Sequence, residues 1–182
     1  MLLYGKNERV GKVSIEAVRE HLKKWGRDQD IMEFDTVSAT VTQAAETIGV
    51  APEEIAKTLS FRGNDNDGFL IVTSGDAKID NKKFKQFFGF KARMLSAEEV
   101  VERTGHPVGG VCPFGLKTPM EIYLDVSLKR FPYVYPACGS INSAIKLTNN
   151  ELFEYANAKG WIDVCKDWQT VENITAIPEA KN

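Results

Sequence analysis

Apolar residues recur at helical spacing near the amino end of the chain, within residues 14–25. The positions on this face are Ile15, Val18, Leu22 and Trp25. Residues spaced three and four apart lie on one side of a helix, so the pattern predicts an amphipathic helix that packs on a core. Ser14 is its predicted N-cap and Gly26 its predicted stop.

Beyond this helix, the pattern interleaves further helices with short strands. Helical spacing and capping residues predict helices at 40–48, 81–88, 96–104 and 148–159, with a short helical turn at 51–54. Alternating apolar and polar residues predict strands at 31–34, 57–61, 69–73, 91–95, 121–126, 131–135, 143–147 and 161–164. In the helix at 81–88, Phe84, Phe87 and Phe88 are expected to face a core.

The order of these elements predicts an α/β (mixed α+β) fold, because helices alternate with strands and hairpins lie between them. We expect a single domain with a central mixed, largely antiparallel sheet flanked by helices. The 182 residues suffice for one such core. The expected organisation is an N-terminal helical extension at 1–30, the main domain at 31–168 and a polar C-terminal tail at 169–182.

Composition narrows the function classes. The 23 Lys and Arg residues against 25 Asp and Glu argue against binding nucleic acid through bulk positive charge. Three cysteines without a Cys-x-x-Cys pair favour reduced thiols, and two histidines are too few for a histidine-rich metal site. The first residues lack the apolar core of a signal peptide, and no apolar run is long enough to span a membrane. We therefore expect a cytoplasmic protein with no cofactor, metal or membrane partner.

The segment 105–115 contains four glycines and two prolines between two regular elements. Glycine allows a ligand to approach the main chain closely, and proline stiffens the loop. Such a loop can direct backbone N–H groups toward an oxygen or a phosphate. The alternative is a surface turn that only reverses the chain.

Four side chains near these elements are candidates for chemistry, each with a structural alternative. Lys57 is either a solvated surface lysine or an ammonium at a pocket that holds a carbonyl, phosphate or ribose oxygen. Cys112 is either a nucleophile or a buried, unreactive thiol. His106 is either a general base or a residue that positions the loop. Asp125 either faces a pocket or caps a turn.

Several motifs, in order and in register, give the chain a resemblance to a known family. They are the segments 50–59, 104–115, 123–127, 138–140 and 145–148. Together they resemble the YbaK/prolyl-tRNA synthetase-associated domain family over roughly residues 34–167. The lysine motif alone is weak. Lys57 followed by the Gly109-x-x-x-Pro113 loop and the Asp125-x-Ser127 strand is a specific combination.

The resemblance implies a free-standing editing enzyme that hydrolyses the ester between a wrong amino acid and the 3′ end of a tRNA. An aminoacyl-tRNA synthetase is a further candidate partner. The resemblance also implies that Lys57 anchors the substrate and that the backbone at Gly109 and Gly110 positions the aminoacyl group. A hydroxyl of the terminal adenosine is expected to help in place of a dedicated protein base. The expected substrate-binding residues are His106, Pro113, Asp125, Ser140 and Asn142. We expect tRNA to dock on a local basic patch formed by Lys82, Lys83, Lys85, Lys91 and Arg93. The alternative is that these charges only form a solvated helix face.

The chain departs from the cysteinyl-tRNA-deacylating branch of that family at two positions. Ala144 stands where that branch has an aspartate, and Phe34 where it has a tyrosine. These departures argue against cysteine specificity and favour another small amino acid. Ser140 and Asn142 are either substrate-selecting or ordinary turn residues. Two other classes stay open: a non-catalytic module that binds an aminoacyl or nucleotide end or a synthetase, and a hydrolase of small esters or thioesters.

Overall fold

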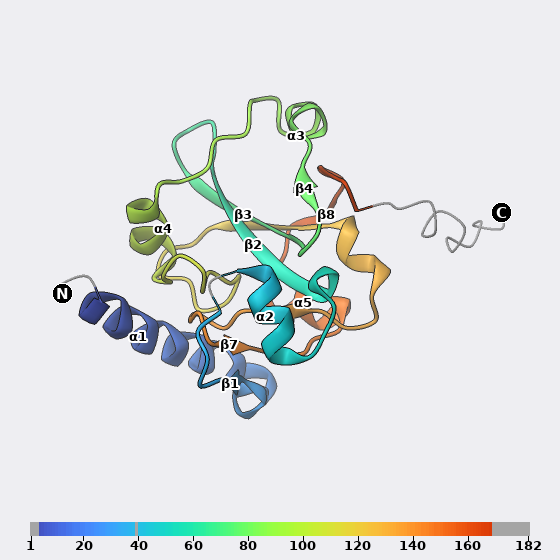
Figure 1. The fold of residues 1–182 in the computed structure, drawn as a ribbon. Helices are drawn as coiled ribbons and strands as arrows, with labels where there is room; N and C mark the ends of the chain where they lie inside the picture. The colour runs from blue at the N-terminus through green and yellow to red at the C-terminus, as the bar shows by residue number, and fades with distance from the viewer. Residues whose placement is uncertain (1–3, 39, 169–182) are drawn as a thin grey trace.

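The fold is built around a five-stranded sheet in the order β6-β2-β3-β5-β8. Its long strands β2 and β3 run through the middle of the molecule (Figure 1). The computed structural model describes residues 4–38 and 40–168. The strands of this sheet are β2 (Ile55–Arg62), β3 (Gly68–Ser74), β5 (Glu121–Asp125), β6 (Tyr135–Pro136) and β8 (Gly160–Ile162). The predicted tail at 169–182 lies outside the described residues.

The sheet is mixed, as predicted, but less antiparallel than expected. β2 and β3 form the predicted antiparallel hairpin, whereas β6 pairs with β2, β5 with β3, and β8 with β5 in parallel. The long connection from β3 to β5 carries two helices and the glycine loop. A connection of this length returns the chain to the same end of the sheet, which is what parallel pairing requires.

Five α-helices surround the sheet in the described part of the chain. They are α1 (Tyr4–Leu22), α2 (Val41–Ile48), α3 (Asn81–Phe88), α4 (Ala97–Thr104) and α5 (Asn149–Tyr155). Thr40, Ser96 and Thr148 cap α2, α4 and α5 by accepting backbone hydrogen bonds, which confirms these helix starts. The predicted cap at Ser14 is wrong, because α1 begins at Tyr4 and Ser14 is buried within it.

Shorter elements complete the fold. The described residues contain four 3₁₀ turns: η1 (Lys23–Trp25), η2 (Asp28–Asp30), η3 (Pro52–Glu54) and η4 (Val126–Arg130). Two strand pairs lie beside the main sheet, β1 (Met32–Glu33) with β7 (Ser143–Ala144) and β4 (Lys78–Ile79) with β9 (Cys165–Lys166). The predicted strand at 91–95 is reduced to an isolated bridge between Met94 and Phe61. The strands at 131–135 and 143–147 are shorter than predicted, and the last helix ends four residues earlier.

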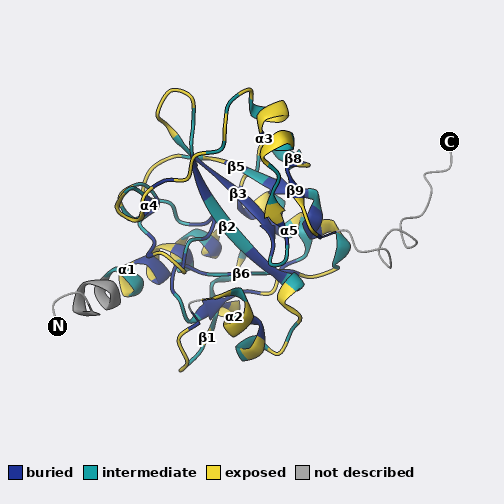
Figure 2. Cartoon of the chain, turned by 45° about the horizontal axis from the view of Figure 1, so that its top comes forward, coloured by how far each residue is buried: buried dark blue, intermediate teal, exposed yellow. Residues whose placement is uncertain are grey.

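Two apolar clusters hold these elements together, and the central strands are largely buried (Figure 2). One cluster joins Ile15, Val18 and Leu22 of α1 to the sheet, so this helix contributes to the core. The other is aromatic and includes Phe84, which is buried as predicted, whereas Phe87 is 53% exposed and does not face the core. None of the helices in the described ranges is long and apolar enough to cross a membrane.

Candidate functional site

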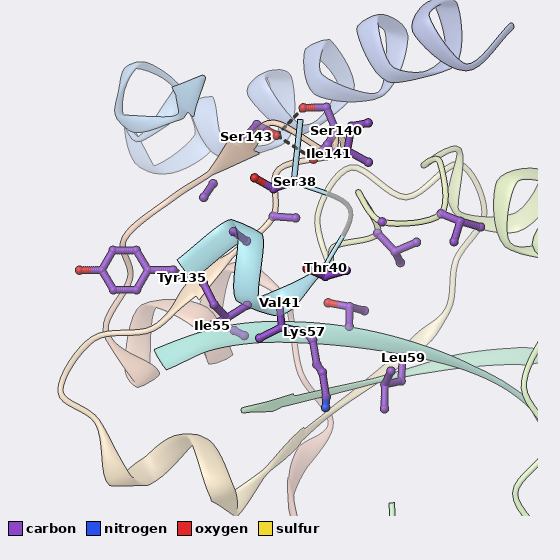
Figure 3. Close-up of a pocket in the computed structure, with 18 of the residues that line it drawn as sticks. Ser38, Thr40, Val41, Ile55, Lys57, Leu59, Tyr135, Ser140, Ile141 and Ser143 are labelled. Carbon is purple, nitrogen blue, oxygen red and sulfur yellow. Dashed lines mark hydrogen bonds between the residues drawn. The ribbon is translucent and has the colours of Figure 1, made fainter. Parts of the chain in front are cut away.

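A pocket of about 330 Å³ opens between β2, α2, the glycine loop and the segment 137–144 (Figure 3). Its walls are mainly apolar, and no carboxylate lines it among the described residues. Seven of the lining residues carry a hydroxyl group: Ser38, Thr40, Thr58, Ser60, Tyr135, Ser140 and Ser143. A concave apolar site with a few polar groups is the usual form of a small-molecule site.

Residues from distant parts of the chain build one polar edge of the pocket. The Ser140 hydroxyl lies 2.7 Å from Ser143 Oγ and 2.9 Å from Asn142 Oδ1. Asn142 Nδ2 donates to the backbone oxygen of Phe34 at 2.8 Å, which ties this edge to the segment before α2. The structure therefore brings the predicted residues Ser140 and Asn142 to the pocket. Phe34 and Ala144, the two positions that differ from the cysteinyl-tRNA-deacylating branch, also line it.

Thr58 supplies a hydroxyl that sequence reasoning did not select. It lines the pocket from β2, and its Oγ1 is buried without a hydrogen-bond partner in the described structure. A buried polar atom without a partner costs free energy, which a ligand atom can recover. The signal was present in the alternation of β2, because Thr58 and Ser60 lie on the face opposite Leu59 and Phe61.

Lys57 lines the pocket, but its ammonium leaves β2 on the side away from Val41 and Ser140 (Figure 3). Nζ donates hydrogen bonds to the backbone oxygens of Gly75 at 3.1 Å and Ala77 at 2.5 Å. Burial lowers the pKa of this ammonium. In this conformation the charge is satisfied by the protein's own carbonyls and does not point into the pocket.

The glycine loop contributes to the pocket through Gly109, whose φ of 91° is in the left-handed region that favours glycine. Gly110 lies behind it and is buried. The Gly110 amide donates to the Pro107 oxygen at 2.9 Å, so it is used within the loop. A Cβ on Gly110 would lie 2.8 Å from backbone atoms of Ser140, which shows how closely the two pocket segments pack.

His106 does not contact the pocket, contrary to its predicted role in substrate binding. The side chain is fully buried, with Nδ1 hydrogen-bonded to the Ser14 hydroxyl and Nε2 lying 2.8 Å from the Phe114 oxygen. Burial lowers the pKa of its imidazole. The histidine therefore fastens the glycine loop to α1, which is the structural alternative considered for it.

Pro113, Cys112 and Asp125 also lie away from the pocket lining. Pro113 is buried within the loop, and burial raises the pKa of the neighbouring Cys112 thiol to about 12, which makes it the unreactive thiol. Asp125 is buried, and its two carboxylate oxygens accept from the Ser127 amide at 2.9 Å and the Val164 amide at 3.0 Å. It caps the turn at η4, which is the structural alternative for this residue, and it does not line the pocket.

The predicted basic patch is only partly available for a ligand. Lys83 donates to Asp163 at 2.8 Å and to the Cys165 oxygen at 3.0 Å, and the hydrogen bond to Asp163 raises the pKa of Lys83. The other members are exposed: Lys82, Lys85, Lys91 and Arg93.

The chain also matches a known protein family. Residues 36–155 match the family described as the aminoacyl-tRNA editing domain. The uncharacterized protein YwhH of Bacillus subtilis (strain 168) is 64% identical over 86% of this chain and 100% of its own length. EbsC of Enterococcus faecalis, named as a candidate Cys-tRNA(Pro)/Cys-tRNA(Cys) deacylase, is 27% identical over 63% of this chain and 71% of its own.

Solved structures agree with the sequence matches. A candidate trans-editing enzyme for prolyl-tRNA synthetase superposes with a TM-score of 0.76 at 30% identity, covering 84% of this chain and 97% of that one. Proline–tRNA ligases also match, but the chain spans only a small part of their length, 16% in the Kosmotoga olearia enzyme.

Proposed function

Because the chain belongs to the aminoacyl-tRNA editing domain family, we propose that it hydrolyses the ester bond of a mischarged aminoacyl-tRNA, acting in trans. The observation that carries the proposal is the apolar pocket with its hydroxyl edge, built largely by residues within the family match. We also propose that the tRNA is engaged through its 3′ end and that the protein works in the cytoplasm.

The pocket fits a small, uncharged amino acid side chain. Its volume of about 330 Å³ also has to accommodate part of the terminal ribose, and its walls offer no carboxylate to a basic side chain in the described residues. Size selection of this kind suits editing, because a synthetase cannot strongly reject a slightly smaller amino acid by binding alone.

An aminoacyl ester is already activated, so positioning can supply much of the rate. No histidine or carboxylate lines the pocket in the described structure, which agrees with a mechanism that uses no protein base there. Water, assisted by a neighbouring hydroxyl of the terminal adenosine, attacks the carbonyl carbon of the ester. The bond from this carbon to the ribose oxygen then breaks, and the ribose oxygen takes up the proton that the water loses. The Thr58 hydroxyl and the backbone at Gly109 are the groups that we propose to hold the ester against this attack.

Cysteine is not the proposed substrate. Phe34 and Ala144 both line the pocket, and neither offers the phenol or carboxylate that the cysteinyl-tRNA-deacylating branch carries at these positions. With both groups replaced by apolar side chains, we propose a preference for an aliphatic or hydroxylated amino acid of similar size.

Replacing Lys57 by alanine is expected to lower deacylation of the preferred substrate about 100-fold, because it removes the side-chain stem that borders the pocket, and a shift of this wall misplaces the ester. The measurement is release of labelled amino acid from a panel of aminoacyl-tRNAs by the wild-type protein and by Lys57→Ala. Lys12→Ala, which removes an exposed lysine of α1 outside the predicted basic patch, is the matched control and is expected to retain most of its activity.

The same panel separates the competing functions. Binding of aminoacyl-tRNA with no hydrolysis above the buffer rate would establish a non-catalytic module in place of the proposed enzyme. Hydrolysis of a free aminoacyl ester at the same rate as the tRNA ester would instead favour a general small-ester hydrolase.

A further inference from the structure

The ammonium of Lys57 rests in a cradle formed by the turn 74–77, directly after β3. The Gly75 and Ala77 oxygens both accept from Nζ, and the turn is closed by a 3.2 Å hydrogen bond from the Ala77 amide to the Ser74 oxygen. Two carbonyls that converge on one cation need a fixed backbone, because each peptide unit must keep its orientation. The position of the ammonium therefore depends on whatever holds this turn.

Arg130 of η4 holds the turn through its whole guanidinium. Nη2 lies 2.5 Å from Asp76 Oδ1 and 2.8 Å from the Ser74 hydroxyl, and Nη1 lies 3.0 Å from Asp76 Oδ2. Nη1 and Nε also donate to the oxygens of Trp168 at 2.8 Å and Ser127 at 3.0 Å. A bidentate arginine–carboxylate pair fixes geometry more strictly than a lysine does. The Arg130 side chain is only 13% exposed, so water screens this pair weakly.

A second contact joins η4 to the same turn. The Ser74 amide donates to the Ser127 hydroxyl at 3.2 Å, and the Ser127 amide is in turn held by Asp125. Burial alone would raise the pKa of Asp76, but hydrogen bonds from Arg130 and Ser74 lower it overall, which keeps the carboxylate charged. Asp125 and Ser127, which belong to the strand motif of the sequence, thus act on the turn and not on the pocket.

We propose that Arg130 and Asp76 are positioning residues for Lys57, which act by fixing the carbonyl cradle at Gly75 and Ala77. Neither residue lines the pocket. Loosening the cradle frees the ammonium and the stem of Lys57, which borders the pocket. The inference rests on the proposed function only where activity is the readout.

The first test needs no activity. The rate at which an amine-reactive reagent modifies each lysine is measured by mass spectrometry in the wild-type protein, in Asp76→Asn and in Arg130→Lys. Asp76→Asn preserves the size of the side chain and is the variant least able to disturb folding. Lys57 is expected to be modified about tenfold faster in both variants, because the turn 74–77 loses charge-assisted hydrogen bonds and no longer holds the Lys57 ammonium firmly. Exposed Lys85 is expected to react at an unchanged rate.

The second test is a double-mutant cycle on deacylation. Asp76→Asn is expected to raise KM about tenfold with little change in kcat, and to have no further effect when Lys57 is already alanine. Unchanged Lys57 reactivity, or an Asp76→Asn effect that persists in full without Lys57, would overturn the inference. A wild-type protein with no deacylase activity would contradict the proposed function alone, because the labelling result stands independently of it.

Discussion

A Gly75→Ala variant is expected to lose about 3 kcal/mol or more of its free energy of unfolding. A Cβ at this position would lie 1.9 Å from the Pro52 oxygen and 2.7 Å from Val41 Cγ1. The first of these atoms belongs to the backbone of η3, so the clash cannot be relieved by rotating a side chain. Overpacking typically costs about 1–3 kcal/mol, and a forced backbone shift adds to that.

Denaturant unfolding of Gly75→Ala measures this loss as a lower midpoint at an unchanged slope. Gly160→Ala is the matched control, since nothing lies within 4 Å of a Cβ placed at that glycine. Equal midpoints for the two variants would show that η3 and the turn after β3 move apart easily. In that case the cradle around the Lys57 ammonium would not be rigid either.

Replacing His106 by alanine is expected to cost about 3 kcal/mol in the free energy of unfolding. The substitution leaves a cavity in the core and removes the hydrogen-bond partner of two buried atoms, Ser14 Oγ and the Phe114 oxygen.

The same substitution should also change how the free energy of unfolding depends on pH. Burial lowers the pKa of His106 from its ordinary value of 6.5, so below that pH the unfolded chain binds a proton that the folded protein does not. The wild-type stability therefore falls as pH drops below about 6.5.

The measurement is urea unfolding of the wild-type protein, His106→Ala and His106→Gln at several pH values between about 5 and 8. Glutamine can still donate to the Phe114 oxygen but does not titrate, so this variant should be more stable than the alanine variant. Both variants should lose the part of the acid dependence that His106 contributes. Parallel pH profiles for all three proteins would contradict a buried neutral imidazole in the folded state.

Local structure was largely predictable because the signals that set it are local. The capping residues Ser96 and Thr148 and the glycine after α3 fix helix ends by hydrogen bonds within a few residues, and these ends were predicted correctly. Ser14 shows the limit of this reasoning, because a hydroxyl in the middle of a helix looks like a cap until its distant partner is known. That partner, His106, lies 92 residues away.

The pocket was predictable only in part, because it depends on contacts between distant segments. The parallel pairing of β6 with β2 brings the segment around Ser140 to Thr58, and nothing local to either segment indicates this. The motifs did indicate Lys57 and Gly109, both of which border the pocket. They did not reveal that the Lys57 ammonium turns toward carbonyls, which depends on the turn after β3.

The packing of α1 makes the folding unit longer than the segment that the family model matches. The family match begins at residue 36, yet Ile15, Val18 and Leu22 share a core with Phe114 in the glycine loop. A Cβ at Gly115 would lie 2.6 Å from the Ala17 oxygen, so the loop and the helix are moulded to each other. A fragment cut at residue 36, where the family match begins, would expose the underside of this loop to water. The family match therefore does not mark the limit of the folding unit, and transplanting the site into another protein would require α1 to be included.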